Sequence, residues 1–124
     1  MNWDKIKDQL TVCVVAETGR YRGARDAENL RKQDEEADAA FERLLKPRVS
    51  QLAYAASRKL GVITSLHVRV WPLVNHMDKT AKACITIRWG GKCGRFEIDG
   101  VAESDADIAS IIDRFAKTLA INRT

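Results

Sequence analysis

The sequence predicts one α+β domain over residues 1–124, with N-terminal helices, a three-stranded antiparallel β-meander and a C-terminal helix packed on one sheet face. Apolar residues recur at helical spacing before residue 60 and again after residue 104. Between these regions, residues 62–99 are predicted to be a β-meander, because parts of this stretch alternate apolar and polar side chains as half-buried strands do. With 45% hydrophobic and 31% charged residues, a chain of this length can bury one core without a metal or disulfide.

The first predicted element is a helix over residues 2–16. Its apolar stripe consists of Trp3, Ile6, Leu10, Cys13 and Val14. Valine and threonine lose rotamer freedom in a helix, so the β-branched run leaves residues 11–16 open to being an extra strand. Residues 18–25 are predicted to be a connector, because Gly19 and Gly23 disfavour helix.

Residues 26–60 are predicted to be helical but divided by proline. The buried stripe is Phe41, Leu45, Val49, Leu52, Ala56 and Leu60. Because Pro47 lacks an N–H group, we expect one helix to about residue 45 and another from Pro47, capped by Gly61. The first half is strongly charged. It is either a solvated helix or a projecting one that pairs with its counterpart in a homodimer or docks on another protein.

Three strands are predicted next. Residues 66–71 alternate and Pro72 ends the strand; a loop follows at 74–78, and residues 84–89 alternate again. Gly90-Gly91 predicts a two-residue turn, with residues 92–98 returning as the third strand. That turn places Trp89 opposite Lys92, Arg88 opposite Cys93, Thr86 opposite Arg95 and Ile85 opposite Phe96.

The last predicted helix covers residues 104–120. Ser104 is a favourable N-cap, and Asp107 completes a pattern like a capping box. The order helix, three strands, helix resembles that of double-stranded-RNA-binding domains in topology alone. The paired lysines that begin the last helix of that family are absent, and Glu103, Asp105 and Asp107 stand there instead and would repel phosphate. The sequence therefore does not predict membership of that family.

The candidate site is the polar side of the predicted sheet. Alternation assigns to it His67, Arg69, Trp71, Cys84, Thr86, Arg88, Cys93, Arg95 and Glu97. Arginines bind phosphates and an indole can stack on a base, so we expect a non-enzymatic binding module that favours nucleic acid, single-stranded or RNA. A protein partner, a plain solvated face or burial under the N-terminal helix are the alternatives.

A second basic cluster, Arg20, Arg22 and Arg25, could clamp phosphates, although Asp26 and Glu28 dilute its charge. The net charge of +4 and the pI of about 9.1 permit nucleic-acid binding without indicating it.

The sequence shows none of the common catalytic, dinucleotide-binding or metal-binding motifs, so we expect no cofactor and no metal. A small enzyme using His67 or His76 as a general base is the third hypothesis. An odd count of three cysteines, Cys13, Cys84 and Cys93, fits free thiols in a reducing cytoplasm. The polar N-terminal stretch predicts no secretory leader, and no apolar run is long enough for a membrane span.

Overall fold

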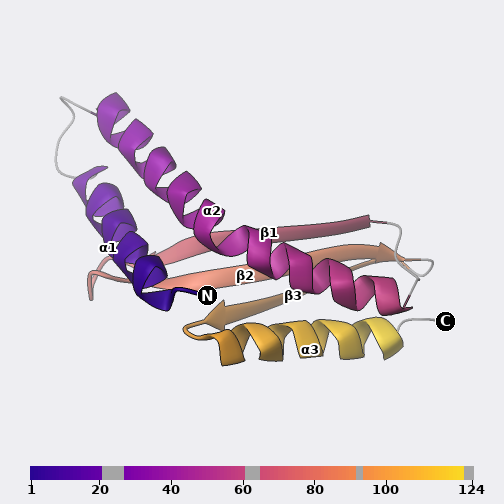
Figure 1. Cartoon of the computed structure of the whole chain (residues 1–124). Helices are drawn as coiled ribbons and strands as arrows, with labels where there is room; N and C mark the ends of the chain where they lie inside the picture. Colours follow the sequence, from indigo (N-terminus) through magenta and orange to yellow (C-terminus); the bar gives the residue numbers. More distant parts are fainter. Residues whose placement is uncertain (21–26, 61–64, 92–93, 122–124) are drawn as a thin grey trace.

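The computed structural model describes residues 1–20, 27–60, 65–91 and 94–121. The chain forms helix α1 (Trp3–Arg20), helix α2 (Ala27–Leu60), strands β1 (Ser65–Asn75), β2 (Thr80–Gly91) and β3 (Gly94–Ala102), and helix α3 (Asp105–Ile121), as Figure 1 shows. The strands form one antiparallel sheet in the order β1-β2-β3. The predicted α+β class, with helices at both ends of the sequence and a meander between them, is confirmed.

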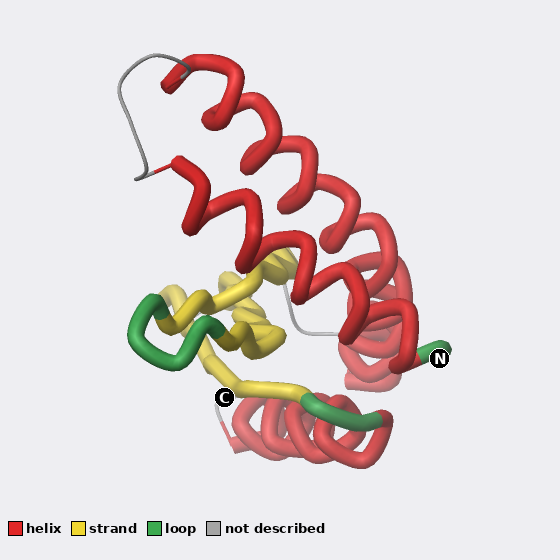
Figure 2. The backbone as a smooth tube through the Cα atoms, turned by 90° about the vertical axis from the view of Figure 1, so that its left-hand side faces the viewer, coloured by secondary structure: helices red, strands yellow, loops and turns green. Residues whose placement is uncertain are grey.

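The three helices lie on one side of the sheet (Figures 1 and 2). The inward side chains of β1 are Leu66, Val68 and Val70, and those of β2 include Ile85, Ile87 and Trp89. They form one core with the buried faces of the helices, including Ile6 and Cys13 of α1, Phe41, Leu45 and Val49 of α2, and Ile108, Ile111, Phe115 and Leu119 of α3. Within this core, Trp89 is stacked on Phe96 with ring centroids 5.7 Å apart and lies edge-on to Phe115 at 4.9 Å.

Helix α1 continues through residues 18–20, so the predicted connector is wrong there. Residues 11–16 are helical, not an extra strand, because Cys13 and Val14 are buried in the face that packs on the rest of the fold. Gly19 is tolerated near the end of the helix, where it lies close to Leu30 of α2. Tertiary packing outweighs the weak helix propensity of this run.

Helix α2 is continuous, so the predicted division at Pro47 is also wrong. The proline instead accounts for the bend of the helix along its length (Figure 1). The half after the bend lies over the sheet, and the half before it extends beyond the sheet beside α1 (Figures 1 and 2). Burial of Phe41, Leu45 and Val49 on both sides of Pro47 offsets the lost hydrogen bond.

Strand β1 runs through Pro72 and ends at Asn75, so the prediction that Pro72 ends the strand is wrong. β1 is an edge strand, paired only with β2. The Tyr54 hydroxyl donates a hydrogen bond to the backbone oxygen of Leu66 (3.4 Å), which indicates that even-numbered residues of β1 turn their backbone groups to the free edge. An N–H at position 72 would point the same way, so its absence removes no sheet hydrogen bond.

The second hairpin differs from the predicted register by four residues. Trp89 pairs with Phe96, Arg88 with Glu97 and Thr86 with Asp99, while Ile85 lies opposite Gly100. Gly90 and Gly91 belong to β2 and pair with Arg95 and Gly94, so they do not form the turn. Lys92 and Cys93, which the prediction placed opposite Trp89 and Arg88, lie outside the described residues, as does the predicted cap Gly61. Because the shift is even, every described strand residue keeps its predicted face.

The predicted start of the last helix is confirmed. Ser104 precedes α3, and its hydroxyl oxygen accepts a hydrogen bond from the Asp107 N–H (3.4 Å). The Asp107 carboxylate in turn accepts one from the Glu103 N–H (2.7 Å). These reciprocal bonds are those of a capping box shifted by one residue, and they start the helix that packs on β3.

Candidate binding face of the sheet

The side of the sheet away from the helices is here called the open face. It consists of the outward side chains His67, Arg69, Trp71, Leu73, Lys82, Cys84, Thr86, Arg88, Arg95, Glu97, Asp99 and Val101. No described helix packs on it, as the view along the strands shows (Figure 2). The alternative in which the N-terminal helix covers this face is therefore wrong.

Cross-strand pairing arranges the centre of the open face in three rows. His67, Arg88 and Glu97 form the first row. The second contains Arg69, Thr86 and Asp99, and the third Trp71, Cys84 and Val101. Neighbouring side chains within a row are close enough to interact directly.

The first row holds an ion pair that the predicted register missed. The Arg88 Nε lies 3.1 Å from Glu97 Oε1, and both side chains are substantially exposed. An exposed pair of this kind contributes little to folding. Its effect on the surface is larger, because Glu97 neutralises one of the three arginines predicted to contact phosphate.

The second and third rows contain an arginine and an indole in contact. The Arg69 Cζ lies 5.3 Å from the centroid of the Trp71 ring, a cation–π arrangement. Trp71 is half-buried and Arg69 is exposed, so the guanidinium also meets solvent. Among the described residues Arg69 forms no ion pair, which leaves its N–H groups free for an external acceptor.

Two outward side chains of the central strand β2, Thr86 and Cys84, are buried. Thr86 is buried, and its hydroxyl donates a 2.6 Å hydrogen bond to an Asp99 carboxylate oxygen. Cys84 is buried with a free thiol, and burial together with the Asp99 carboxylate raises its pKa. A neutral, covered thiol is a poor nucleophile, so the chemistry of this face lies in its charged and aromatic groups.

The described outward side chains of the sheet carry four basic groups and two carboxylates. The basic groups are Arg69, Lys82, Arg88 and Arg95, and the acidic ones are Glu97 and Asp99. Arg95 and Lys82 are exposed, and neither forms an ion pair within the described parts of the chain. After the Arg88–Glu97 pair is set aside, the face keeps an excess of positive charge.

The second predicted cluster does not join this face. Arg20 is the last residue of α1, whose end rises away from the sheet in both views (Figures 1 and 2). Arg22 and Arg25 lie outside the described residues.

The two histidines lie in different parts of the fold and make different contacts. His67 is exposed in the first row of the open face. His76, in the β1–β2 loop, places its Nε2 3.3 Å from Glu17 Oε1 and so connects the loop to α1. Neither histidine lines the groove of about 760 Å³ that runs along α1. Among the described residues, no group of three or more His, Cys, Asp or Glu side chains is placed to hold a metal ion.

A cluster of acidic groups, of which Asp34 is buried, lies where α1 and α2 meet. Asp34 is buried, and partial burial together with the carboxylates of Asp34 and Glu17 raises the pKa of Asp38 to about 6. Burial, then the Asp38 carboxylate, raises the pKa of the Cys13 thiol to about 12. The acidic run that contains Asp34 and Asp38 is visible in the sequence and is typical of a solvated helix face, but Asp34 is buried. Its approach to Glu17 and Cys13 could not be predicted, because the pattern does not reveal which helices pair.

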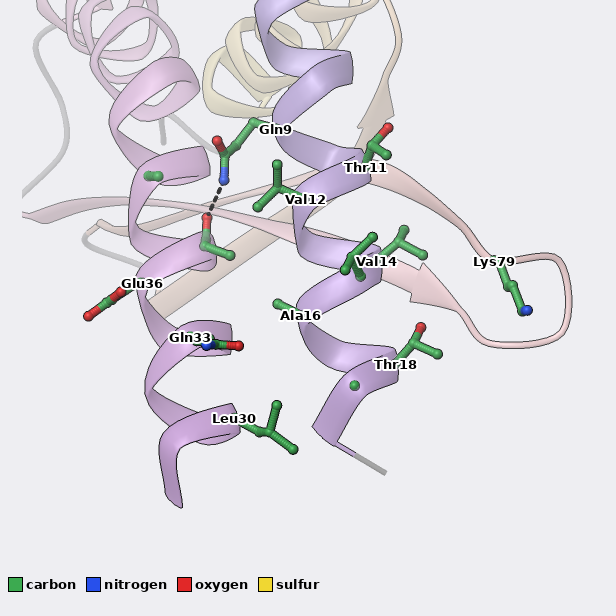
Figure 3. Close-up of a pocket in the computed structure, with 14 residues that line it drawn as sticks. Gln9, Thr11, Val12, Val14, Ala16, Thr18, Leu30, Gln33, Glu36 and Lys79 are labelled. Atoms are coloured by element: carbon green, nitrogen blue, oxygen red, sulfur yellow. Dashed lines mark hydrogen bonds between the residues drawn. The ribbon is translucent and has the colours of Figure 1, made fainter. Parts of the chain in front are cut away.

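An apolar groove of about 760 Å³ runs along α1 (Figure 3). Val12 and Ala16 of α1 and Leu30 of α2 point into the space between the two helices. Gln9, beside them, is already engaged, donating a hydrogen bond to the Ala37 backbone oxygen (3.1 Å). Lys79 of the β1–β2 loop borders the groove at one edge, and Glu36 of α2 points outward at the other.

Comparison with known proteins adds no relative: no protein-family model, no curated protein and no solved structure matches the chain. No described helix is long and apolar enough to cross a membrane. A function has to be argued from the open face and the groove themselves.

Proposed function

We propose that the protein is a non-enzymatic module that binds single-stranded nucleic acid on the open face of its sheet. The observation that carries the proposal is the contact between Arg69 and Trp71 on a face that no described helix covers. An arginine held against an indole offers a cation to a phosphate beside an aromatic surface for a base.

The geometry supports single strands better than duplexes. Bases stack on an aromatic side chain only when they are unpaired and can splay outward. The described part of the open face also lacks the protruding helix or ribbon with which proteins enter the major groove. Arg95 and Lys82, at separate points of the open face, would contact phosphates along a strand that passes over Trp71.

Arg88 has a different role from the one that its residue type suggests. Since it pairs with Glu97, it screens a carboxylate that would otherwise repel the phosphate backbone. Removal of Arg88 exposes that negative charge, so the loss of binding should equal or exceed the loss caused by removal of an unpaired arginine.

The test is fluorescence anisotropy with a labelled single-stranded oligonucleotide of about ten nucleotides, titrated from about 50 to 200 mM salt. Trp71→Ala should weaken binding by about 1–3 kcal/mol through lost stacking. Arg69→Ala and Arg95→Ala should each lower the slope of log K against log salt by about 0.7. Arg88→Ala should weaken binding at least as much as Arg95→Ala.

Arg58→Ala is the matched control, because Arg58 is an exposed arginine in the last turn of α2. It removes the same charge from a helix on the other side of the sheet, so it should leave the affinity within about twofold. Absence of any anisotropy change at the lowest salt, or an equal loss with Arg58→Ala, would rule out the open face as a nucleic-acid site.

A protein-interaction module, with a homodimer among its forms, is the second candidate. The apolar groove along α1 favours it, because Val12 and Val15 line the groove and are exposed to water. Exposed apolar patches mark contacts with other proteins.

A further inference from the structure

The solvent side of α1 has an unusual composition for an exposed helix face. From Thr11 to Ala16 the sequence contains no charged residue. Val12 is 50% exposed and Val15 is 68% exposed. On the neighbouring stretch of α2, by contrast, the exposed positions include Arg31, Lys32 and Glu35. Valine is a weak helix former and gains nothing from exposure, so these side chains are candidates for a contact outside the monomer.

The shape of this surface narrows the kind of contact. Val12 and Val15 are the exposed valines of α1, here called its crest, and both also line the groove of about 760 Å³ between α1 and α2. Ala16, beside them, points into the same groove (Figure 3). A ridge that runs beside a groove is complementary to a second ridge and groove, which is the geometry by which helices pack on each other.

The charges at the two edges point to the same occupant. Lys79 borders the surface on the side of the β1–β2 loop, and Glu36 borders it on the side of α2 (Figure 3). A two-fold axis parallel to the helices places the Lys79 edge of one copy opposite the Glu36 edge of the other. The ammonium group of each copy then faces the carboxylate of the other, while each crest enters the partner's groove.

We propose that the chain forms a homodimer in which the α1 crest of each copy, Val12 and Val15, packs in the partner's α1–α2 groove. The occupant of the groove is thus a second copy of this chain. The uncharged face of α1 is buried in two ways: it inserts into the partner's groove, and it forms one wall of the groove that receives the partner's helix. The pairs formed between Lys79 of one copy and Glu36 of the other fix the parallel orientation. This contact uses none of the residues of the open face, so it stands or falls independently of nucleic-acid binding.

The oligomeric state tests the proposal directly. Multi-angle light scattering over about 1–100 µM should give a mass approaching twice 13.9 kDa. Val15→Lys should raise the dissociation constant roughly 30-fold or more, because a charge then lies at the centre of the contact. Lysine is a better helix former than valine, so this variant should fold as well as the parent chain.

Leu73→Lys is the matched control, since Leu73 is 53% exposed on the open face and the change is the same in kind. It should leave the dimer unchanged. Glu36→Lys and Lys79→Glu should each weaken the dimer, and the two together should restore it, which a foreign partner would not reproduce.

A monomer at every concentration would overturn the proposal and leave the groove to another protein or to an apolar ligand. A dimer that Val15→Lys leaves intact, or that Leu73→Lys disrupts equally, would place the interface elsewhere and overturn it as well.

Discussion

Gly100 in β3 is the residue on which the close packing of α3 depends. A Cβ atom at this position would lie 2.6 Å from Cγ1 and Cδ1 of Ile111, which is itself buried. Gly100→Ala should therefore force α3 away from the sheet and lower the free energy of unfolding by about 1–3 kcal/mol. Urea denaturation followed by circular dichroism measures the change.

Gly19→Ala, the same type of substitution in α1, should have the opposite effect on stability. Its new Cβ would meet Leu30 at 3.6 Å, an ordinary contact, and alanine favours helix over glycine. The variant should be more stable by a few tenths to about 1 kcal/mol. If Gly100→Ala and Gly19→Ala changed the free energy of unfolding equally, α3 would have to move without cost. That result would contradict the close packing at Gly100.

At the scale of elements, the contact between α1 and α2 should be sensitive to pH through Asp38. The pKa of this carboxyl, about 6, lies above its ordinary value of 3.8, because of partial burial and the nearby carboxylates of Asp34 and Glu17. The folded chain therefore binds the proton more tightly than the unfolded chain. The contribution of Asp38 to stability is unfavourable at pH 7 and improves as the pH falls through 6 towards 4.

Asp38→Asn should remove this contribution and raise the free energy of unfolding at pH 7. Solvent screening of a partly exposed group limits the gain to about 1 kcal/mol or less. The difference between variant and parent should shrink as the pH is lowered from 7 to about 4. Glu35→Gln, at an exposed carboxylate on the same helix, should show a smaller difference at pH 7. A gain that persists at low pH would assign the effect to something other than the proton.

The faces of the strands could be read from the sequence, whereas the register of the second hairpin could not. Alternation depends only on which residues face the core, and it placed Arg69, Trp71 and Arg88 correctly on one side. The glycine pair suggested a turn that would set Trp89 opposite a lysine. The observed pairing sets it against Phe96 instead. Aromatic packing outweighs the local turn preference, and this is why the Arg88–Glu97 pair could not be foreseen.

The two prolines show the same limit of local signals. Pro47 and Pro72 each predict a break, because each removes one backbone donor. The helix and the strand both continue, since flanking side chains are buried at the first site and the second lies on a free sheet edge. Whether a proline ends an element depends on where its missing N–H would point, which only the tertiary arrangement decides.

For the whole molecule, the three helices on one side of the sheet separate two surfaces: the open face and the α1 crest with its groove (Figures 1 and 2). The β-branched run at residues 11–16 left open whether this segment is a helix or a strand, and the exposure of Val12 and Val15 on α1 could be learned only from the fold. Since the surfaces do not share residues, a dimer formed through α1 would leave two open faces available at once.

Two available faces predict that affinity for single-stranded nucleic acid depends on strand length. An oligonucleotide long enough to reach both faces of a dimer converts the second binding event into an intramolecular one, and its apparent affinity should exceed that of a short strand by roughly 100-fold or more. Anisotropy titrations with a series of lengths should show a step once the strand spans the dimer. Val15→Lys should abolish the step and leave the affinity for the shortest strand unchanged, whereas Trp71→Ala should weaken every length. A smooth rise with length in both the parent chain and Val15→Lys would mean that the two surfaces do not cooperate.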